Sequence, residues 1–172
     1  MAAGLIVPRT LGIDPSLART GYAILEDSTR CVVEAGVITT NPRATLPARL
    51  SELAAAIEEL LEEFSPRRLG VEDLFAHYNH PRTAILMGHA RGVILLAAGR
   101  RDISVETFTA TRIKKSLTGN GHATKLQMQR AIMATLGLSR MPEPSDVADA
   151  IAAGLCALSA HRRERQADPL KK

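Results

Sequence analysis

The N-terminal part of the chain contains three short apolar segments, and their spacing constrains the fold more than any other feature. They occupy residues 10–14, 21–26 and 31–39 and are rich in Val, Ile, Leu and Tyr. Turn-forming sequences separate them: Asp-Pro-Ser follows the first segment and Glu-Asp-Ser-Thr follows the second. Because connections this short join antiparallel strands, the sequence predicts consecutive β-hairpins at the start of the domain.

The apolar period then changes from that of strands to that of a helix. Leu50, Leu53, Ile57 and Leu60 follow helical spacing up to Phe64, with glutamates on the opposite side. A proline two residues later ends this predicted helix.

Alternating strands and helices are predicted for the rest of the chain. A fourth strand is expected at residues 68–75, and its position after a helix favours a parallel partner in the sheet. A long apolar helix at residues 81–98 and a fifth strand at residues 103–108 follow. The remainder has helical character with one glycine-rich break at residues 118–121. We therefore predict an α/β fold, a mixed five-stranded sheet flanked by helices.

The length of 172 residues suits one domain. We expect this domain at residues 10–161, after a flexible lead at residues 1–9 and before a basic flexible tail at residues 162–172. The longest apolar stretch is interrupted by His89 and Arg91, and the N-terminus lacks the basic start of a signal peptide. With only two cysteines in the chain, we expect a cytoplasmic protein with no membrane partner.

Basic residues are segregated along the chain. Residues 107–142 contain six basic side chains and no acidic one, although the net charge of the whole chain is only +4. Such segregation suits a surface that binds a polyanion, because cationic side chains release the counterions of phosphates. A solvated helix face explains the same pattern equally well from composition alone. The basic residues of this stretch include Arg112, Lys114, Lys115 and Lys125.

Two isolated carboxylates fall on strands of the predicted sheet. Asp14 ends the first strand, and Glu72 lies in the fourth strand, flanked by the apolar residues Val71 and Leu74. A carboxylate in a buried strand is costly unless it is paired or binds a metal ion. If the first and fourth strands are adjacent and parallel, the two side chains converge at one edge of the sheet.

A second acidic pair opens the last predicted helix. Asp146 and Asp149 are three residues apart, so their side chains share one face of the helix. N-terminal capping is the commoner explanation for acidic residues at a helix start. All four carboxylates together suit hard divalent cations, which prefer oxygen ligands. Two-metal hydrolysis of a phosphodiester needs such a set around ions about 3.5–4 Å apart.

Four motifs in a fixed order resemble the RuvC family of Holliday junction resolvases. The first motif is LGIDPSLARTGY at residues 11–22, and the resemblance extends over residues 10–160. Ser16 departs from it, because we expect glycine there. The other three motifs are VEDLF at 71–75 with GHARG at 88–92, TGNGHATK at 118–125 and DVADA at 146–150.

The resemblance implies an RNase H-like fold and a set of site residues. It implies that Mg²⁺, or Mn²⁺ in its place, binds as two ions to Asp14, Glu72, Asp146 and Asp149. Phe75 is expected to stack on an unpaired base at the junction centre, although a strand phenylalanine is more often a core residue. Lys114 and Lys125 match positions that face the DNA backbone. From the basic stretch, Lys115 and Arg112 are added as DNA-binding candidates.

Small residues recur every fourth position on the helix at residues 81–98, at Ala84, Gly88 and Gly92. Alone, this pattern favours close packing within the domain. The resemblance implies a homodimer through this helix instead, since cutting two strands of a two-fold symmetric junction needs two matching sites. It also implies cooperation with a RuvAB-like branch-migration complex.

The expected activity is metal-dependent cleavage of four-way DNA junctions in recombination and repair. Two alternatives stay open. One is a nucleotide-binding phosphotransferase of the actin and sugar-kinase type, suggested by Asp14 and Gly21 flanking the first turn. The other is a junction-binding protein without catalytic activity.

Overall fold

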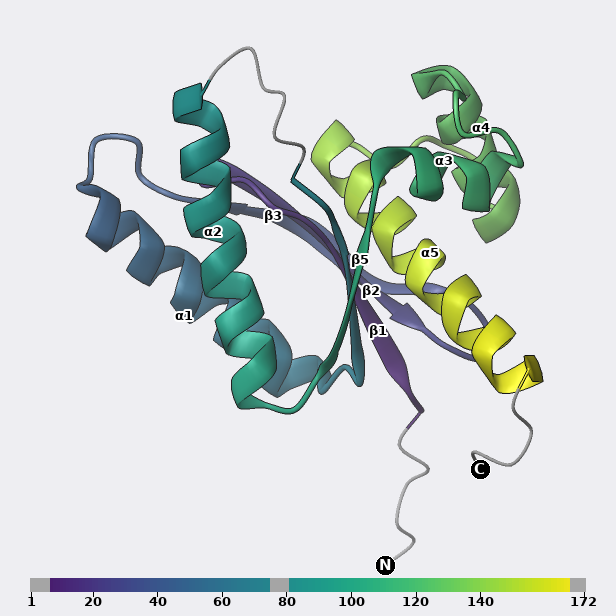
Figure 1. The fold of residues 1–172 in the computed structure, drawn as a ribbon, viewed down its shortest axis with the longest axis horizontal. Helices are drawn as coiled ribbons and strands as arrows, with labels where there is room; N and C mark the ends of the chain where they lie inside the picture. Colours follow the sequence, from purple (N-terminus) through teal and green to yellow (C-terminus); the bar gives the residue numbers. More distant parts are fainter. Residues whose placement is uncertain (1–6, 75–80, 168–172) are drawn as a thin grey trace, which may run out of the picture.

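In the computed structural model, residues 7–74 and 81–167 are placed well enough to describe. Figure 1 shows the strands and helices of these ranges. They follow one another in the order β1 (Arg9–Asp14), β2 (Arg19–Glu26), β3 (Val32–Thr39), α1 (Leu46–Phe64), β4 (Arg68–Glu72), α2 (Pro81–Arg100), β5 (Ser104–Phe108), α3 (Ala110–Thr118), α4 (Lys125–Leu136) and α5 (Ser145–Ala167).

The five strands form one mixed sheet in the order β3-β2-β1-β4-β5. β1 pairs antiparallel with β2, and β2 pairs antiparallel with β3, as the hairpin spacing predicted. β4 lies parallel to β1 and to β5. The predicted mixed five-stranded sheet is confirmed. The first and fourth strands, whose adjacency the sequence left as a condition, lie next to each other and parallel.

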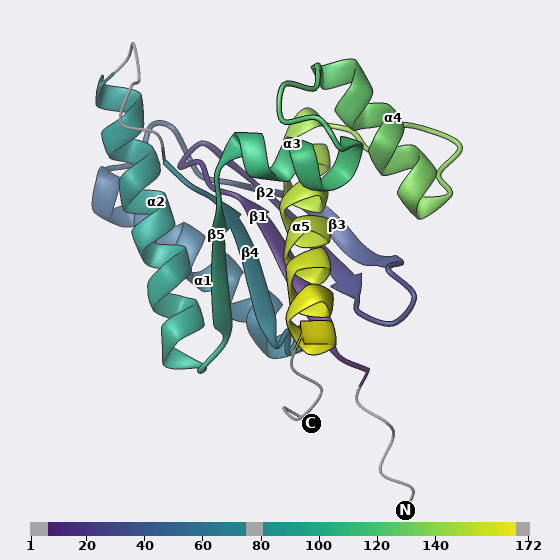
Figure 2. The same cartoon turned by 45° about the vertical axis from the view of Figure 1, so that its right-hand side comes forward.

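Helices cover both faces of the sheet (Figures 1 and 2). α1 and α2 lie on one face, and α5 crosses the other, with α3 and α4 beside its N-terminal part. Leu11, Ile13 and Leu69 face α1 and α2, where they are fully buried. Ala23 and Leu25 face α5. No helix within the described ranges combines the length and the apolar character that a membrane crossing needs.

Glycines on the sheet let α5 approach its backbone closely. A Cβ atom on Gly12 would lie 2.1 Å from the carbonyl oxygen of Ala150, and one on Gly70 would lie 2.5 Å from that of Ala153. At Gly21 a Cβ would lie 2.1 Å from the carbonyl oxygen of Asp146. Real Cβ atoms do not approach this closely, so side chains at these positions would displace the helix.

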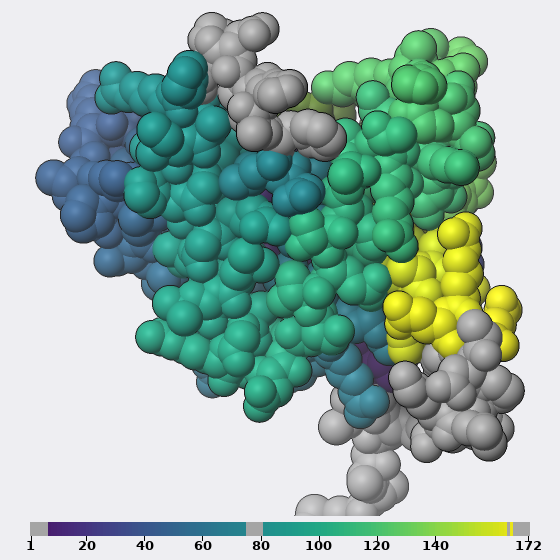
Figure 3. All heavy atoms as spheres, in the orientation of Figure 1, coloured from purple at the N-terminus to yellow at the C-terminus, as the bar shows by residue number. Residues whose placement is uncertain are grey.

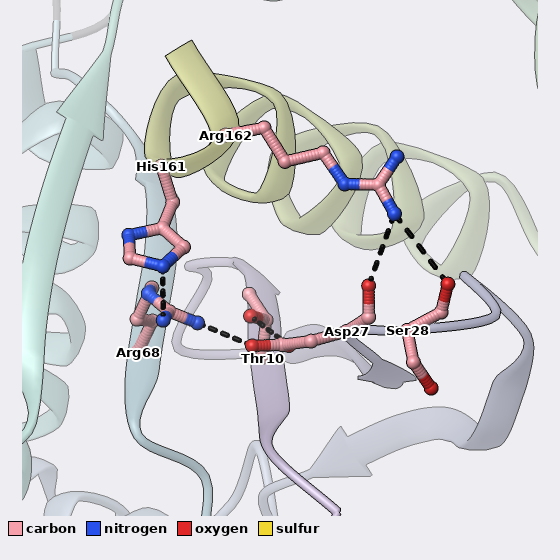
Figure 4. Close-up of polar contacts among 6 residues, drawn as sticks. All are labelled: Thr10, Asp27, Ser28, Arg68, His161 and Arg162. Carbon is pink, nitrogen blue, oxygen red and sulfur yellow. Dashed lines mark hydrogen bonds and ion pairs between the residues drawn. The ribbon is translucent and has the colours of Figure 1, made fainter. Parts of the chain in front are cut away.

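Polar side chains hold the opposite end of α5 (Figure 4). Arg68 on β4 forms an ion pair with Asp27, and its guanidinium lies 2.7 Å from Nε2 of His161. Thr10 on β1 donates a hydrogen bond to Asp27 at 2.7 Å. Arg162 reaches the backbone carbonyls that follow β2. α5 is therefore fixed by close packing near its start and by this polar cluster near its end.

Some boundaries differ from those predicted. β4 ends at Glu72, whereas the prediction extended it to residue 75. Asp73 still donates its N–H to the Phe108 carbonyl, and residue 75 lies outside the described ranges. The predicted flexible tail begins as helix, since α5 continues to Ala167 with Arg162 anchored as above. At the other end, Arg9 already pairs with Glu26 in the sheet, while residues 1–6 lie outside the described ranges.

We predict that Gly12→Ala destabilises the fold. The added methyl group collides with backbone rather than with a flexible side chain, and overpacking of this kind costs about 1–3 kcal/mol. Gly99→Ala is the matched control, because a Cβ there meets no atom within 4 Å. Urea unfolding should give a lower midpoint for Gly12→Ala and an equal or higher one for Gly99→Ala. Equal midpoints for Gly12→Ala and the unsubstituted protein would refute the close-packing argument.

Candidate active site and metal centre

Asp14 and Glu72 end two neighbouring parallel strands. The residues before them, Ile13 and Val71, are paired partners in the sheet, so the two carboxyl-bearing positions lie side by side. Side chains two apart on a strand share a face, and therefore Asp14 and Glu72 project to the same face as Gly12 and Gly70. That face is the one on which α5 packs. The predicted convergence of the strand carboxylates at one edge is confirmed.

α5 brings the other two carboxylates to this edge. The helix begins at Ser145, with Asp146 in its first turn and Asp149 in the next. Gly21, the β-sheet partner of Asp14, accommodates the backbone of Asp146. Within the described part of the chain, neither aspartate accepts a hydrogen bond from a backbone N–H, so capping of the helix does not account for the pair.

Three of the four carboxylates have a raised pKa. Burial raises the pKa of Asp14 from 3.8 to about 7, with the negative charges of Asp149, Glu72 and Asp146 adding in that order. Burial also raises the pKa of Glu72 and of Asp149. Asp149 contributes to the shift of Asp14 and to that of Glu72, so residues from distant parts of the sequence share one electrostatic site.

Two lysines border the carboxylates. The charge of Lys114 on α3 lowers the pKa of Glu72, and that of Lys125 at the start of α4 lowers the pKa of Asp149, in each case against the larger effect of burial. A cavity of about 310 Å³ has both lysines and both acids in its wall. The structure thus places Lys114 and Lys125 where an anion approaching the carboxylates would meet them.

The four carboxylates are the kind of ligand that a hard divalent cation prefers, although in this structure they are not arranged around a common point. All four side chains offer carboxylate oxygens. The pKa of Asp14 is raised first by burial and then by neighbouring negative charges, which a cation would compensate. Among the described residues, no three His, Cys, Asp or Glu side chains are arranged to hold one ion. Asp146 pairs with Arg19 at 3.1 Å instead.

Two of the other predicted DNA-binding residues, Arg112 and Lys115, do not line this cavity. Arg112 and Lys115 project from the other side of α3 and line a separate cavity with Arg163. Phe75 lies within residues 75–80, outside the described ranges, so its predicted stacking on a base stays a prediction. In the first turn, Thr20 donates a hydrogen bond to the carbonyl of Ser16, so the side chain of Thr20 holds the turn that follows Asp14.

Sequence reasoning overlooked two arginines near the carboxylates. Arg19 neutralises part of the charge of Asp146. Arg91, a half-buried residue of α2, donates a hydrogen bond to Thr107 at 3.0 Å and lies 3.8 Å from the carboxylate of Asp73, the residue after Glu72. Arg19 lies in the motif at residues 11–22 and Arg91 in the motif at residues 88–92. The motifs alone did not show which acidic side chain each arginine would contact.

Comparison with known proteins connects these features to a family. The family model described as "Crossover junction endodeoxyribonuclease RuvC" matches residues 10–157. A protein of that name from Rhodopirellula baltica is 50% identical over 148 residues, which cover 85% of this chain and 83% of that protein. Another from Thermosipho melanesiensis is 39% identical over 150 residues, covering 86% and 95% respectively.

Solved structures agree in fold. RuvC from Thermus thermophilus in complex with a Holliday junction substrate superposes with a TM-score of 0.85 at 28% identity, covering 91% of this chain and 96% of that one. The yeast mitochondrial Holliday junction resolvase gives a TM-score of 0.61 at 13% identity, covering 94% and 84%, which shows a shared fold. The predicted RNase H-like fold class is confirmed.

The shift of Asp14 predicts how stability depends on pH in the metal-free protein. Between about pH 4 and 7 the folded state retains a proton that the unfolded state has released, so the free energy of unfolding falls as pH rises through this range. Asp14→Asn removes the buried charge. It should therefore raise the free energy of unfolding above pH 7, by up to about 4 kcal/mol, with the gain vanishing near pH 4.

Urea unfolding in chelator at pH 5 and pH 8 measures this difference. Asp102→Asn is the control, because Asp102 is exposed and its positive φ of 53° suits asparagine equally well. Adding Mg²⁺ should stabilise the unsubstituted protein more than Asp14→Asn. If the free energy of unfolding depends on pH in the same way for Asp14→Asn and for the unsubstituted protein, Asp14 does not have a raised pKa in the folded protein.

Proposed function

The chain belongs to the RuvC family of crossover junction endodeoxyribonucleases, and on this premise we propose that it resolves four-way DNA junctions by metal-dependent hydrolysis of phosphodiesters. The single observation that supports this function best is the meeting of carboxylates from β1, β4 and α5 beside two lysines. Buried acids that raise one another's pKa are costly to a fold, and clusters of such groups occur at functional sites.

We propose that Asp14, Glu72, Asp146 and Asp149 hold two Mg²⁺ ions, with Mn²⁺ as a substitute. When bound, the ions lower the pKa of a water and neutralise charge on the phosphate. Asp14 and Glu72 supply oxygen ligands from rigid strands, and Asp149 faces them from α5. Arg19 fixes Asp146 in the absence of a cation.

Lys114 and Lys125 hold the phosphodiester in this proposal. Both line the cavity that contains Glu72 and Asp149, so a phosphate seated there meets positive charge on one side and the acids on the other. Arg112 and Lys115 add backbone contacts farther from the cut, and Phe75 stacks on an unpaired base. Such contacts hold the DNA without reading its sequence, because phosphates are the same in every sequence.

We propose that the protein acts as a homodimer through α2, whose surface lies on the outside of the fold (Figure 3). Ile85 is 61% exposed and Leu96 is 56% exposed. With His89 and Gly92 they form an exposed stripe at helical spacing. A Cβ on Gly92 would meet no atom within 4 Å, so this glycine serves no packing contact among the described residues. A second copy of the helix would cover the stripe.

Two further parts of the proposal rest on the family alone. A RuvAB-like branch-migration complex would deliver the junction to the dimer. The protein would act in the cytoplasm, where chromosomal DNA in a bacterial cell lies.

A junction-cleavage assay tests the activity. With Mg²⁺ or Mn²⁺ the protein should cut a synthetic four-way junction and leave linear duplex uncut. Asp14→Asn should lower the cleavage rate at least about 10²-fold, since an ion held by this carboxylate contributes several kcal/mol to the reaction. Junction affinity should be nearly unchanged, because phosphate contacts supply most of it.

Controls separate catalysis from binding alone. Asp102→Asn should cut at the rate of the unsubstituted protein. A protein that binds junctions but never cuts them with any divalent metal is a binding protein only, and that result would sink the proposed activity. Cleavage by Asp14→Asn at the normal rate would show that the carboxylate cluster is not the active site.

Substitution on α2 tests the dimer. Burying an isoleucine or leucine contributes about 1.5–3 kcal/mol, so Ile85→Glu with Leu96→Glu should weaken self-association at least about tenfold. Analytical ultracentrifugation measures the change. Val33→Glu is the matched control, because Val33 is an exposed apolar residue on β3, 41% exposed. A dimer that survives the α2 substitutions uses another surface.

A further inference from the structure

A second basic cavity lies on the far side of α3 from the carboxylates. Its volume is about 180 Å³, and its lining includes Arg112 and Lys115 from α3 and Arg163 from α5. A water molecule occupies about 30 Å³ in the liquid, so the cavity has room for a phosphate group in place of several waters. In Figure 3 the surface of α3, in green, meets the C-terminal part of α5, in yellow.

Among the residues that the structure describes, no acidic side chain lies within ion-pair distance of the three cations of this cavity. The four ion pairs of the described residues all involve other basic side chains. The guanidinium of Arg112 lies over the ring of Phe108, 5.1 Å from its centroid. Stacking of this kind fixes the plane of the guanidinium and leaves the N–H groups at its edge to bind an anion.

Glu106 on β5 and Glu164 on α5 are the acidic groups near this cavity. Burial raises the pKa of Glu106, and Glu164 adds to that shift, whereas Arg68 and Arg112 lower it. The balance of charge around the cavity is therefore positive, with Glu106 half-buried and Arg112, Lys115 and Arg163 exposed at the rim.

The two cavities are built on the same pair of helices. On α3, Ile113 and Lys114 face the carboxylate cavity, while Arg112 and Lys115 line the basic one. On α5 the lining residues form one stripe at spacings of three or four, which passes from the carboxylate cavity to the basic cavity. The members of this stripe are Asp149, Ala152, Cys156, Ala160 and Arg163.

This stripe sets the distance between the cavities. An α-helix rises about 1.5 Å per residue, so Ala160 lies roughly 12 Å beyond Ala152 along α5. One strand of a duplex advances about 3.4 Å along its axis per phosphate. The separation therefore matches roughly three or four phosphates of a strand that runs beside α5. The full stripe from Asp149 to Arg163 spans about 21 Å at the same rise, which matches about six phosphates.

We propose that the cavity bordered by Arg112, Lys115 and Arg163 is a second phosphate site, which binds the backbone of the same DNA arm about three to six nucleotides from the phosphate that is cut. This inference rests on the proposed function and deepens it. Its consequence is mechanical: a phosphate held on each side of α3 fixes the direction in which the arm leaves the active site.

Methylphosphonate substitution of the DNA tests the proposal on the unsubstituted protein. Each uncharged linkage removes one phosphate charge from a junction arm, and affinity is measured in chelator so that no cutting occurs. The result expected is a loss of affinity of about three- to tenfold at one or two linkages within three to six nucleotides of the cut position. Equal affinities for all linkages in that window would overturn the proposal.

A variant in which glutamine replaces the three cations of the cavity shows whether the loss of affinity arises at this cavity. The triple variant Arg112→Gln, Lys115→Gln, Arg163→Gln should lower the slope of log affinity against log salt by about 1–2 and should lose its response to the same methylphosphonates. Arg67→Gln is the matched control, since Arg67 is exposed at the opposite end of β4 from Glu72. Its salt slope should equal that of the unsubstituted protein.

The outcomes separate this inference from the proposed function. If the triple variant binds junctions with an unchanged salt slope while Asp14→Asn abolishes cutting, the second phosphate site is wrong and the nuclease assignment stands. If the unsubstituted protein never cuts, the nuclease assignment fails, and the salt slope of the triple variant still shows whether the cavity binds phosphate. Unfolding midpoints for each variant show that any loss of affinity is not a loss of fold.

Discussion

The close contact between α5 and the sheet is the constraint on which the site depends. Gly12, Gly21 and Gly70 allow backbone to pack on backbone, so the start of α5 lies against the ends of β1 and β4. Without these glycines the helix would sit farther out, as it does where side chains separate a helix from a sheet. Asp146 and Asp149 would then stand away from Asp14, and their charges would not meet.

The contact between α5 and the sheet buries carboxylates close together at the ends of β1 and β4, which costs free energy of folding. Burial and mutual repulsion raise the pKa of Asp14 to about 7, far above that of an exposed aspartate. The hydrophobic packing on both faces of the sheet and the polar cluster around Arg68 and Asp27 stabilise the sheet and the far end of α5. Stability is thus concentrated away from the carboxylates, and the site is held in place although its own charges disfavour it.

In the proposed function, one face of the sheet binds DNA and the other face carries the dimer helix. The α5 face carries the carboxylates, the lysines and the basic cavity, so it is the face that DNA would meet. The opposite face carries α2 with its exposed apolar stripe. Arg91 on α2 contacts Thr107 on β5 and approaches Asp73, so one side chain links the proposed dimer helix to the end of the strand that bears Glu72.

The sequence alone determined the mixed sheet with its two N-terminal hairpins and the alternating helices and strands that follow, because hairpin turns and apolar periods are local. The four acidic positions came as a set from motifs that resemble a known family. The sequence did not determine that Asp146 pairs with Arg19, that β4 stops at Glu72, or that Arg112 and Lys114 border different cavities. These depend on which elements pack together and on the side of a helix each residue occupies. Only tertiary structure decides them, since the partners are distant in the chain and contact is set by three-dimensional packing.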